Sequence, residues 1–156
     1  LNNAVAQLTI NGSILEFMGT ADAHRGWDRL DRLPGLVDAL RELDDDDTDD
    51  PAVMIGVTHA PYQRVLNAFT TQRADLIFAG HTHGGQVCLP GGRAIITNCD
   101  LPRDRARGLS VWNHAHEASY LNVSAGIGTS IYAPVRFACP PEAVLVTLVG
   151  DDIGYS

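Results

Sequence analysis

Two short apolar segments, each followed by a histidine, restrict the possible folds of this chain more than any other feature. Residues 52–58 precede His59, and residues 74–79 lead through a glycine to His81. Both segments are rich in aliphatic residues and bounded by turn-forming residues, as buried strands are. Between them, Pro61 can begin a helix whose apolar residues recur on one face. The stretch therefore predicts a β-α-β unit with parallel strands.

The predicted strands place three histidines at one edge of the sheet. His59 follows the first strand, and the motif Gly80-His81-Thr82-His83-Gly84-Gly85 follows the second. In such units ligands bind beyond the carboxyl ends of the strands, and the glycines let the backbone approach a ligand closely, which makes Gly84 a candidate for substrate contact. Imidazole is the commonest protein ligand for transition metals, so His59, His81 and His83 predict a metal site. Loop histidines that only cap a turn are the alternative.

The composition favours one soluble globular domain and excludes several classes of function. The chain has 156 residues, 45% of them hydrophobic, and no apolar run approaches the roughly 20 residues that cross a bilayer. No targeting leader is visible at the start. All eleven basic residues are arginines without a basic stripe, so we expect no nucleic-acid partner.

Acidic residues and cysteines limit the chemistry further. The net charge of the chain is −8, and residues 44–50 alone carry six negative charges, which predicts an acidic surface loop. A calcium-binding loop would need a different spacing of glycine and glutamate. The three cysteines, an odd number, argue against a disulfide scaffold and favour a reducing compartment. Cys139 is expected to be a buried apolar residue, and Cys99 lacks a base partner for nucleophilic catalysis.

The other expected elements complete a mixed α/β chain in which strands outnumber helices. They follow from alternating or helical apolar spacing and from turn residues such as Asn11-Gly12, which favours a type I′ turn. The expected elements are a hairpin over 4–18, a helix within 27–43 disturbed by Pro34, a short strand at 93–97 in the loop-rich stretch 86–117, and strands at 120–124 and 143–149.

Together these features resemble the carboxyl-terminal half of a calcineurin-like metallophosphoesterase. The resemblance implies an α/β fold, half of a four-layer α-β-β-α sandwich with a mixed sheet and flanking helices, and residues 1–156 as part of one such domain. Later segments narrow it to a bacterial branch with membrane-associated phosphodiesterases, some of which act on lipid-linked sugar nucleotides. The matching segments are His59, Gly80 to Gln86, Gly126-Ile127-Gly128-Thr129-Ser130 and Pro134 to Glu142.

The resemblance also implies a mechanism and a set of cofactors. His59 and His81 would bind one divalent ion and His83 a second, with manganese, iron or zinc as suitable metals. The ions would polarise the phosphoryl oxygens and lower the pKa of a bridging water that attacks phosphorus in line. The substrate would be a phosphorylated small molecule or a lipid-linked phosphoester.

Three other motifs of that family have no counterpart in this chain: its Asp-x-His pair, its Gly-Asp-x-x-Asp segment and its Gly-Asn-His-Asp/Glu segment with the catalytic histidine. Asp22-Ala23-His24 superficially matches the first, but it follows a hairpin, so we expect Asp22 and His24 at the substrate rim, with a role as metal ligands as the alternative. We therefore expect the chain to begin after the lost motifs and to contain no catalytic residue. Without a bridging carboxylate, it should bind one ion weakly or none and be inactive alone.

Several alternatives stay open. Arg136 could contact a substrate phosphate or pair with an acid such as Glu142. His114 and His116 repeat the histidine spacing but are expected to be surface residues. The chain could instead be a non-catalytic module that binds another chain through an exposed sheet face, covered by a missing amino-terminal half or a homodimer. Its expected location is cytoplasmic, or at a membrane through a segment not present here.

Overall fold

The computed structural model describes residues 1–42 and 52–149, which form a mixed six-stranded sheet. The central strands β2, β3, β4 and β6 are parallel, and the outer strands β1 and β5 pair antiparallel with their neighbours. The α/β class with a mixed sheet and flanking helices is thus confirmed, whereas the predicted acidic loop at 44–50 lies outside the described residues. In spatial order the strands are β1 (Ala4–Ile10), β2 (Ser13–Gly19), β3 (Val53–Thr58), β4 (Leu76–Ala79), β6 (Glu117–Val123) and β5 (Gly108–His114).

The hairpin of β1 and β2 follows directly from its turn residues. Asn11 and Gly12 both have positive φ, 52° and 90°, as a type I′ turn requires. Glycine and asparagine adopt this conformation at low cost, so the two-residue loop fixes the register that pairs Ile10 with Ser13. The predicted hairpin is confirmed.

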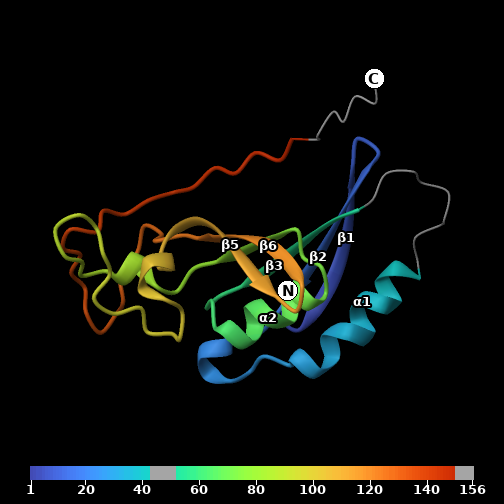
Figure 1. Ribbon diagram of the computed structural model, residues 1–156, viewed down its shortest axis with the longest axis horizontal. Helices are drawn as coiled ribbons and strands as arrows, with labels where there is room; N and C mark the ends of the chain where they lie inside the picture. The colour runs from blue at the N-terminus through green and yellow to red at the C-terminus, as the bar shows by residue number, and fades with distance from the viewer. Residues whose placement is uncertain (43–51, 150–156) are drawn as a thin grey trace.

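Two helices, α1 (Leu33–Arg41) and α2 (Gln63–Thr71), cover the same face of the sheet (Figure 1). Helix α1 begins at Leu33 with Pro34 in its first turn, where a missing N–H group costs no hydrogen bond. It therefore starts later than the predicted segment 27–43, and Leu30–Arg32 form a short 3₁₀ turn before it. The predicted helix between β3 and β4 is confirmed as α2.

The core lies between these helices and the sheet. Phe69 of α2 is fully buried and packs against Gly56 of β3, where a Cβ atom would lie 2.5 Å from the Phe69 ring. Met18, Ile77 and Leu121 bring β2, β4 and β6 into the same cluster. Truncating a core phenylalanine to alanine typically costs about 3–5 kcal/mol, so this contact holds α2 firmly on the sheet.

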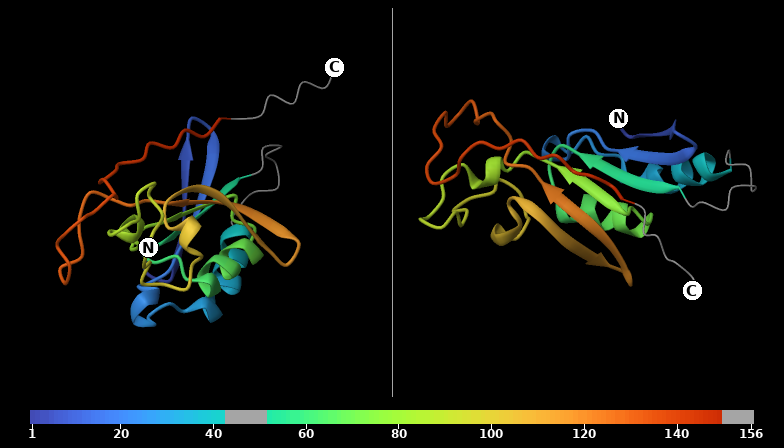
Figure 2. Two further views of the ribbon diagram at one scale, coloured as in Figure 1. Left: turned by 60° about the vertical axis from the view of Figure 1, so that its left-hand side comes forward. Right: turned by 90° about the horizontal axis from the view of Figure 1, so that it is seen from above.

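Within the described residues, no helix covers the opposite face of the sheet. Val57 of β3 is 39% exposed and Tyr120 of β6 is 60% exposed. Each is opposite an apolar residue of β4, Val57 opposite Phe78 and Tyr120 opposite Leu76. Residues 141–149 run along this side as an extended segment (Figure 2). The predicted strand at 143–149 is wrong: among the described residues no neighbouring strand pairs with it, and Leu145 is 92% exposed.

The segment between β4 and β6 differs from its prediction in two places. Strand β5 was not expected, and the predicted strand at 93–97 is reduced to an isolated bridge between Cys88 and Ala94. The turn between β5 and β6 consists of Ala115 and His116, both with positive φ but neither a usual turn residue, so the hairpin left no turn signal in the sequence. In residues 1–42 and 52–149, no helix is both long and apolar enough to cross a bilayer.

Candidate metal centre

The pairing of β3 with β4 places the predicted histidines together. Thr58 is opposite Ala79 in this parallel pair, so the residues that follow both strands emerge at the same edge. The N–H of Gly80 donates to the carbonyl oxygen of His59 at 3.0 Å and extends the contact past the strand ends. His81 then takes a positive φ of 67°, which turns the chain out of the sheet.

These histidines line a cavity of about 830 Å³ at the carboxyl ends of the parallel strands. It is bounded by the turn after β4, by the segment after β2 and by loop residues near 96 and 130. The predicted metal ligands and both predicted residues of the rim border it, together with one arginine. These residues are Asp22, His24, Arg25, His59, His81 and His83.

His59 and His81 contact each other directly. Nε2 of His59 lies 3.0 Å from Nδ1 of His81, and Nε2 of His81 lies 3.3 Å from the carbonyl oxygen of Asn98. Because a carbonyl can only accept, His81 donates from Nε2 and leaves Nδ1 as an acceptor for the N–H of His59. The backbone at Asn98 therefore selects one tautomer of His81 and points its free lone pair at His59.

Burial keeps the histidines after β4 neutral. Removal from water lowers the pKa of His81, and the neighbouring His59 lowers it further against the opposing hydrogen bond to Asn98. The pKa of His83 is also lowered, first by burial and then by the positive charge of Arg136. Both imidazoles therefore have an unprotonated nitrogen at neutral pH, as a metal ligand must.

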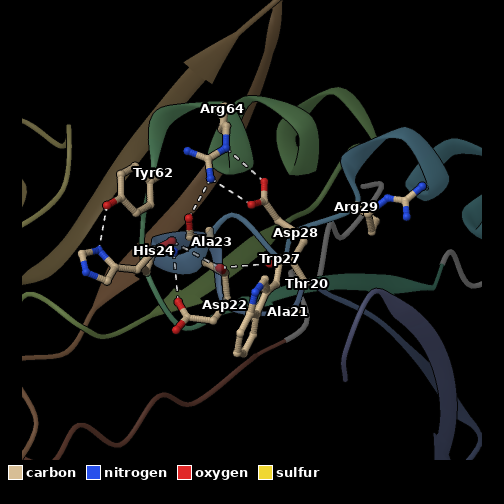
Figure 3. Close-up of polar contacts among 12 residues, drawn as sticks. Thr20, Ala21, Asp22, Ala23, His24, Trp27, Asp28, Arg29, Tyr62 and Arg64 are labelled. Atoms are coloured by element: carbon tan, nitrogen blue, oxygen red, sulfur yellow. Dashed lines mark hydrogen bonds and ion pairs between the residues drawn. The ribbon is translucent and has the colours of Figure 1, made fainter.

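His24 joins the cluster from the segment after β2 (Figure 3). Its ring centroid lies 4.6 Å from that of His81, and its Nδ1 lies 2.9 Å from the hydroxyl oxygen of Tyr62. The carboxylate of Asp22 accepts from the backbone N–H of His24 at 2.9 Å and holds this short turn. The hydroxyl of Tyr62 donates in turn to Asn98 at 3.4 Å.

The carbonyl of Asn98 thus connects two histidines, and sequence reasoning had given it no role. Asn98 has a positive φ of 55°, a conformation that asparagine adopts more readily than most residues. The asparagine is thus a local signal for a turn at this position. The sequence does not show, however, that the loop containing Asn98 folds back to contact the histidines.

The two remaining candidates occupy different positions. Gly84 is buried behind the histidine turn, where a Cβ atom would lie 2.8 Å from the sulfur of Cys139, and Gly85 borders the cavity instead. Arg136 donates to carbonyl oxygens of the surrounding loops, including that of His83 at 3.1 Å. The carboxylate of Glu142 accepts from the N–H of Ala125 at 2.8 Å rather than from this arginine. The other carbonyls that Arg136 contacts belong to Ala125, Gly126, Gly128 and Cys139.

The donor chemistry of the cavity fits a divalent ion, but the number of donors does not complete a site. Two nitrogens bound to one ion at about 2.0–2.1 Å lie about 3.0–3.4 Å apart, which matches the separation between His59 and His81. A ligand histidine usually donates its other N–H to a carbonyl or carboxylate, as His81 does. However, no group of three or more histidine, cysteine or acidic side chains meets in a metal-binding arrangement within the described ranges.

The second histidine pair is at the opposite end of the sheet. His114 ends β5, and His116 lies in the turn before β6, which runs parallel to β4. This turn is therefore at the amino ends of the parallel strands. Both side chains are exposed, as expected for surface histidines.

Comparison with known proteins gave a partial sequence match. No family model matches the chain, and no solved structure matches it. Over 76 residues the chain is 36% identical to an uncharacterized metallophosphoesterase of Aquifex aeolicus, strain VF5. The match covers 49% of this chain and 26% of the relative, so it spans about a quarter of that protein's length. The comparison supports similarity to a metallophosphoesterase at the level of the superfamily.

Proposed function

We propose that this chain is part of a metal-dependent phosphoesterase, which hydrolyses a phosphodiester or a phosphomonoester. The observation that carries the proposal is the 3.0 Å contact between Nε2 of His59 and Nδ1 of His81 at the carboxyl ends of two parallel strands. The similarity to the Aquifex metallophosphoesterase supports the same chemistry. In this proposal His59 and His81 hold one divalent ion, and His83 contributes to a second.

The residues of the chain have distinct tasks in this site. Asn98 fixes the tautomer of His81, so that the unprotonated Nδ1 faces Nε2 of His59 and could bind an ion that replaces the proton between the two nitrogens. Tyr62 orients His24, which stands at the rim where a substrate phosphate would enter. Divalent ions bound here, with manganese, iron and zinc suited to imidazole ligands, would supply the positive charge that activates water and stabilises phosphoryl oxygens.

Asp22 is the only acidic residue among the described residues that border the cavity, and no group of three or more histidine, cysteine or acidic side chains in the described ranges forms a metal-binding arrangement. Two divalent ions held close together by neutral ligands repel each other strongly, and negative ligands between them relieve that repulsion. We propose that polypeptide outside these 156 residues supplies the carboxylates and the catalytic groups. The isolated chain would then bind one ion weakly or none and would be inactive.

The rim of the cavity supports a substrate with an apolar part. Ile96 is 62% exposed and Tyr132 is 91% exposed, and both border the cavity, as does the charged side chain of Arg25. Cationic and apolar groups side by side suit a phosphoester with an apolar substituent, such as a lipid-linked phosphate. A phosphorylated small molecule would use the polar part of the same cavity.

The test compares the full-length gene product with the 156-residue chain in the presence of Mn²⁺. Both are assayed with bis-(p-nitrophenyl) phosphate and p-nitrophenyl phosphate. We expect hydrolysis by the longer protein only, lost in its His81→Ala variant and kept in its His114→Ala variant. Activity of the short chain would refute the incomplete site, and an active His81→Ala variant would refute the metal role of His81.

A second candidate function is a binding module that uses the open face of the sheet. The observation in its favour is the exposure of Val57, Leu109 and Tyr120 on the face opposite the helices. A missing amino-terminal half or a second copy of the chain could cover this face. Light scattering after size-exclusion chromatography tests the homodimer: a monomer at micromolar concentration excludes it.

A further inference from the structure

Two buried thiols lie directly behind the histidine turn. Cys88 and Cys139 are free cysteines with 1% and 2% of their surfaces exposed. The sulfur of Cys88 donates to the carbonyl oxygen of Gly84 at 3.2 Å, and that of Cys139 donates to the same oxygen at 3.4 Å. Cys139 also donates to the carbonyl oxygen of His83 at 3.2 Å. Two thiols that share one acceptor are held close to each other.

The backbone around the thiols has the geometry of neighbouring strands. Val87 and Phe137 form a parallel bridge, in which the N–H of Cys88 donates to Phe137 at 2.9 Å and the N–H of Phe137 donates to Gln86 at 2.9 Å. Cys139 is therefore one residue beyond the position opposite Cys88. Ala138, which precedes it, has a positive φ of 50° that interrupts the strand alternation, so both thiols reach the carbonyl oxygen of Gly84. Such diagonal positions lie roughly 6 Å apart, within the Cα separation of about 4.4–6.8 Å that disulfides span.

We propose that Cys88 and Cys139 form a reversible disulfide, a redox-sensitive tether between segments 86–88 and 137–139 behind the candidate metal centre. Ala94 and Ala106 complete the small apolar cluster around the two sulfurs. The guanidinium of Arg136 reaches the sulfur of Cys139 from the edge of this cluster at 3.8 Å. The third cysteine, Cys99, packs against the main core and is not part of this cluster.

The oxidant is a low-molecular-weight disulfide such as oxidised glutathione. One protein thiol loses its proton and attacks the oxidant, so that a mixed disulfide forms and one glutathione leaves as a thiol. The second protein sulfur then attacks the first, the protein S–S bond forms, and the second glutathione leaves as a thiol. Two protein thiols are oxidised and one disulfide is reduced. The oxidant can reach the buried sulfurs only when residues 137–139 open locally. The backbone hydrogen bonds of the bridge between Val87 and Phe137 must break for this opening.

Disulfide formation would also act on the histidine turn. The thiol hydrogens that bond to the carbonyl oxygens of His83 and Gly84 are lost, and Gly84 packs directly against Cys139, whose sulfur would lie 2.8 Å from a Cβ atom at that glycine. We therefore expect the oxidised form to alter the position of His83. This consequence rests on the proposed metal role of His83, whereas the disulfide itself does not.

The experiment uses the full 156-residue chain with Cys99→Ser as its background and a series of reduced-to-oxidised glutathione ratios. Free thiols are trapped by alkylation and the products are analysed by mass spectrometry. We expect the loss of two hydrogen masses and a linked peptide pair containing residues 88 and 139. The melting midpoint should rise by roughly 5–10 °C on oxidation and return with dithiothreitol.

The controls are Cys88→Ser and Cys139→Ser in the same background, which should show neither the linkage nor the rise in melting midpoint. If a variant does not fold, as judged by circular dichroism, differential alkylation of the unsubstituted chain gives the same information. The proposal is overturned if the thiols of Cys88 and Cys139 still react with the alkylating reagent after incubation with oxidised glutathione alone. A linkage to Cys99 in the unsubstituted chain, or one seen only in urea, overturns it as well. None of these readouts requires phosphoesterase activity, so failure here and failure of the proposed function can be told apart.

Discussion

The two His-x-His segments of this chain have the same spacing but different surroundings. His81-Thr82-His83 follows a buried parallel strand, and the next strand in the sheet brings His59 to the same edge. His114-Ala115-His116 spans the turn of an antiparallel hairpin at the opposite end, where both histidines are exposed. The first segment therefore borders a cavity, and the second faces solvent.

The difference shows that position in the sheet, and not spacing, makes a histidine pair a candidate site. At the carboxyl ends of parallel strands, loops from several segments converge and exclude water. At the hairpin, β5 and β6 extend past the residues of β6 that pair with β4, and the histidines of the turn are exposed.

The largest effect should come from removing an imidazole. In the full-length gene product, His81→Ala should weaken binding of Mn²⁺ or Zn²⁺ at least about 100-fold, roughly 2.7 kcal/mol, whereas His114→Ala should leave it unchanged. Titration calorimetry and metal analysis of the purified proteins measure this. Equal affinities for the two variants would remove the distinction between the segments.

The next effect concerns the turns themselves. Gly85 has a φ of 89°, and a Cβ atom there would lie 2.8 Å from the Cα of Ala94, so Gly85→Ala should lower the free energy of unfolding by about 2–4 kcal/mol. Ala115 has a φ of 50°, and Ala115→Gly should be neutral or stabilise by about 1 kcal/mol. Urea denaturation of the 156-residue chain tests both. A well-tolerated Gly85→Ala would show that the turn can rearrange.

A smaller effect should appear on acidification. The pKa values of His81 and His83 are lowered in the folded state, so the unfolded chain binds more protons below its own histidine pKa of about 6.5. Their contribution to stability is complete above about pH 6.5 and is lost as the pH falls towards their folded pKa values. The urea concentration at the unfolding midpoint should therefore decrease as the pH is lowered from 7.5 to 5.

A double variant tests the origin of that dependence. His81→Gln combined with His83→Gln should flatten the fall in the urea midpoint, because the groups that titrate are gone. The His114→Gln variant should keep the wild-type dependence. A slope that persists in the double variant would assign it to other groups.

The smallest effect should come from the tyrosine beside His24. Tyr62→Phe removes the 2.9 Å hydrogen bond to Nδ1 of His24 and should cost about 1 kcal/mol of stability. Tyr120→Phe, on the exposed face of the strand that follows the second histidine segment, should cost nothing measurable. Thermal unfolding of the two variants side by side decides this.

Sequence reasoning succeeded where structure depends on neighbouring residues. The turn chemistry of Asn11 and Gly12 specified the hairpin, and apolar periodicity specified β3, α2 and β4. Because parallel strands emerge at one edge, these elements were also enough to bring His59 and His81 together. Their contact follows from topology rather than from any distant loop.

The failures depend on partners far away in the chain. The apolar segment 143–149 has the composition of a strand, but a strand requires a neighbour, and the described sheet offers none to it. Strand β5 exists because β6 pairs with it, and its turn has no glycine or asparagine. The link from Asn98 to His81 and Tyr62 depends on the path of a loop, which local sequence does not encode.

Beyond the histidine turn, the long connection from β4 to β5 forms one wall of the cavity, and it is held to the rest of the fold mainly where Asn98, Asp100 and Leu101 make contact. Evolution could lengthen or shorten the rest of this wall while these contacts, the strands and the histidine turn keep their places. Related proteins could therefore share one reaction centre and differ in the molecules they accept, with most of the diversity confined to a single exchangeable stretch of chain.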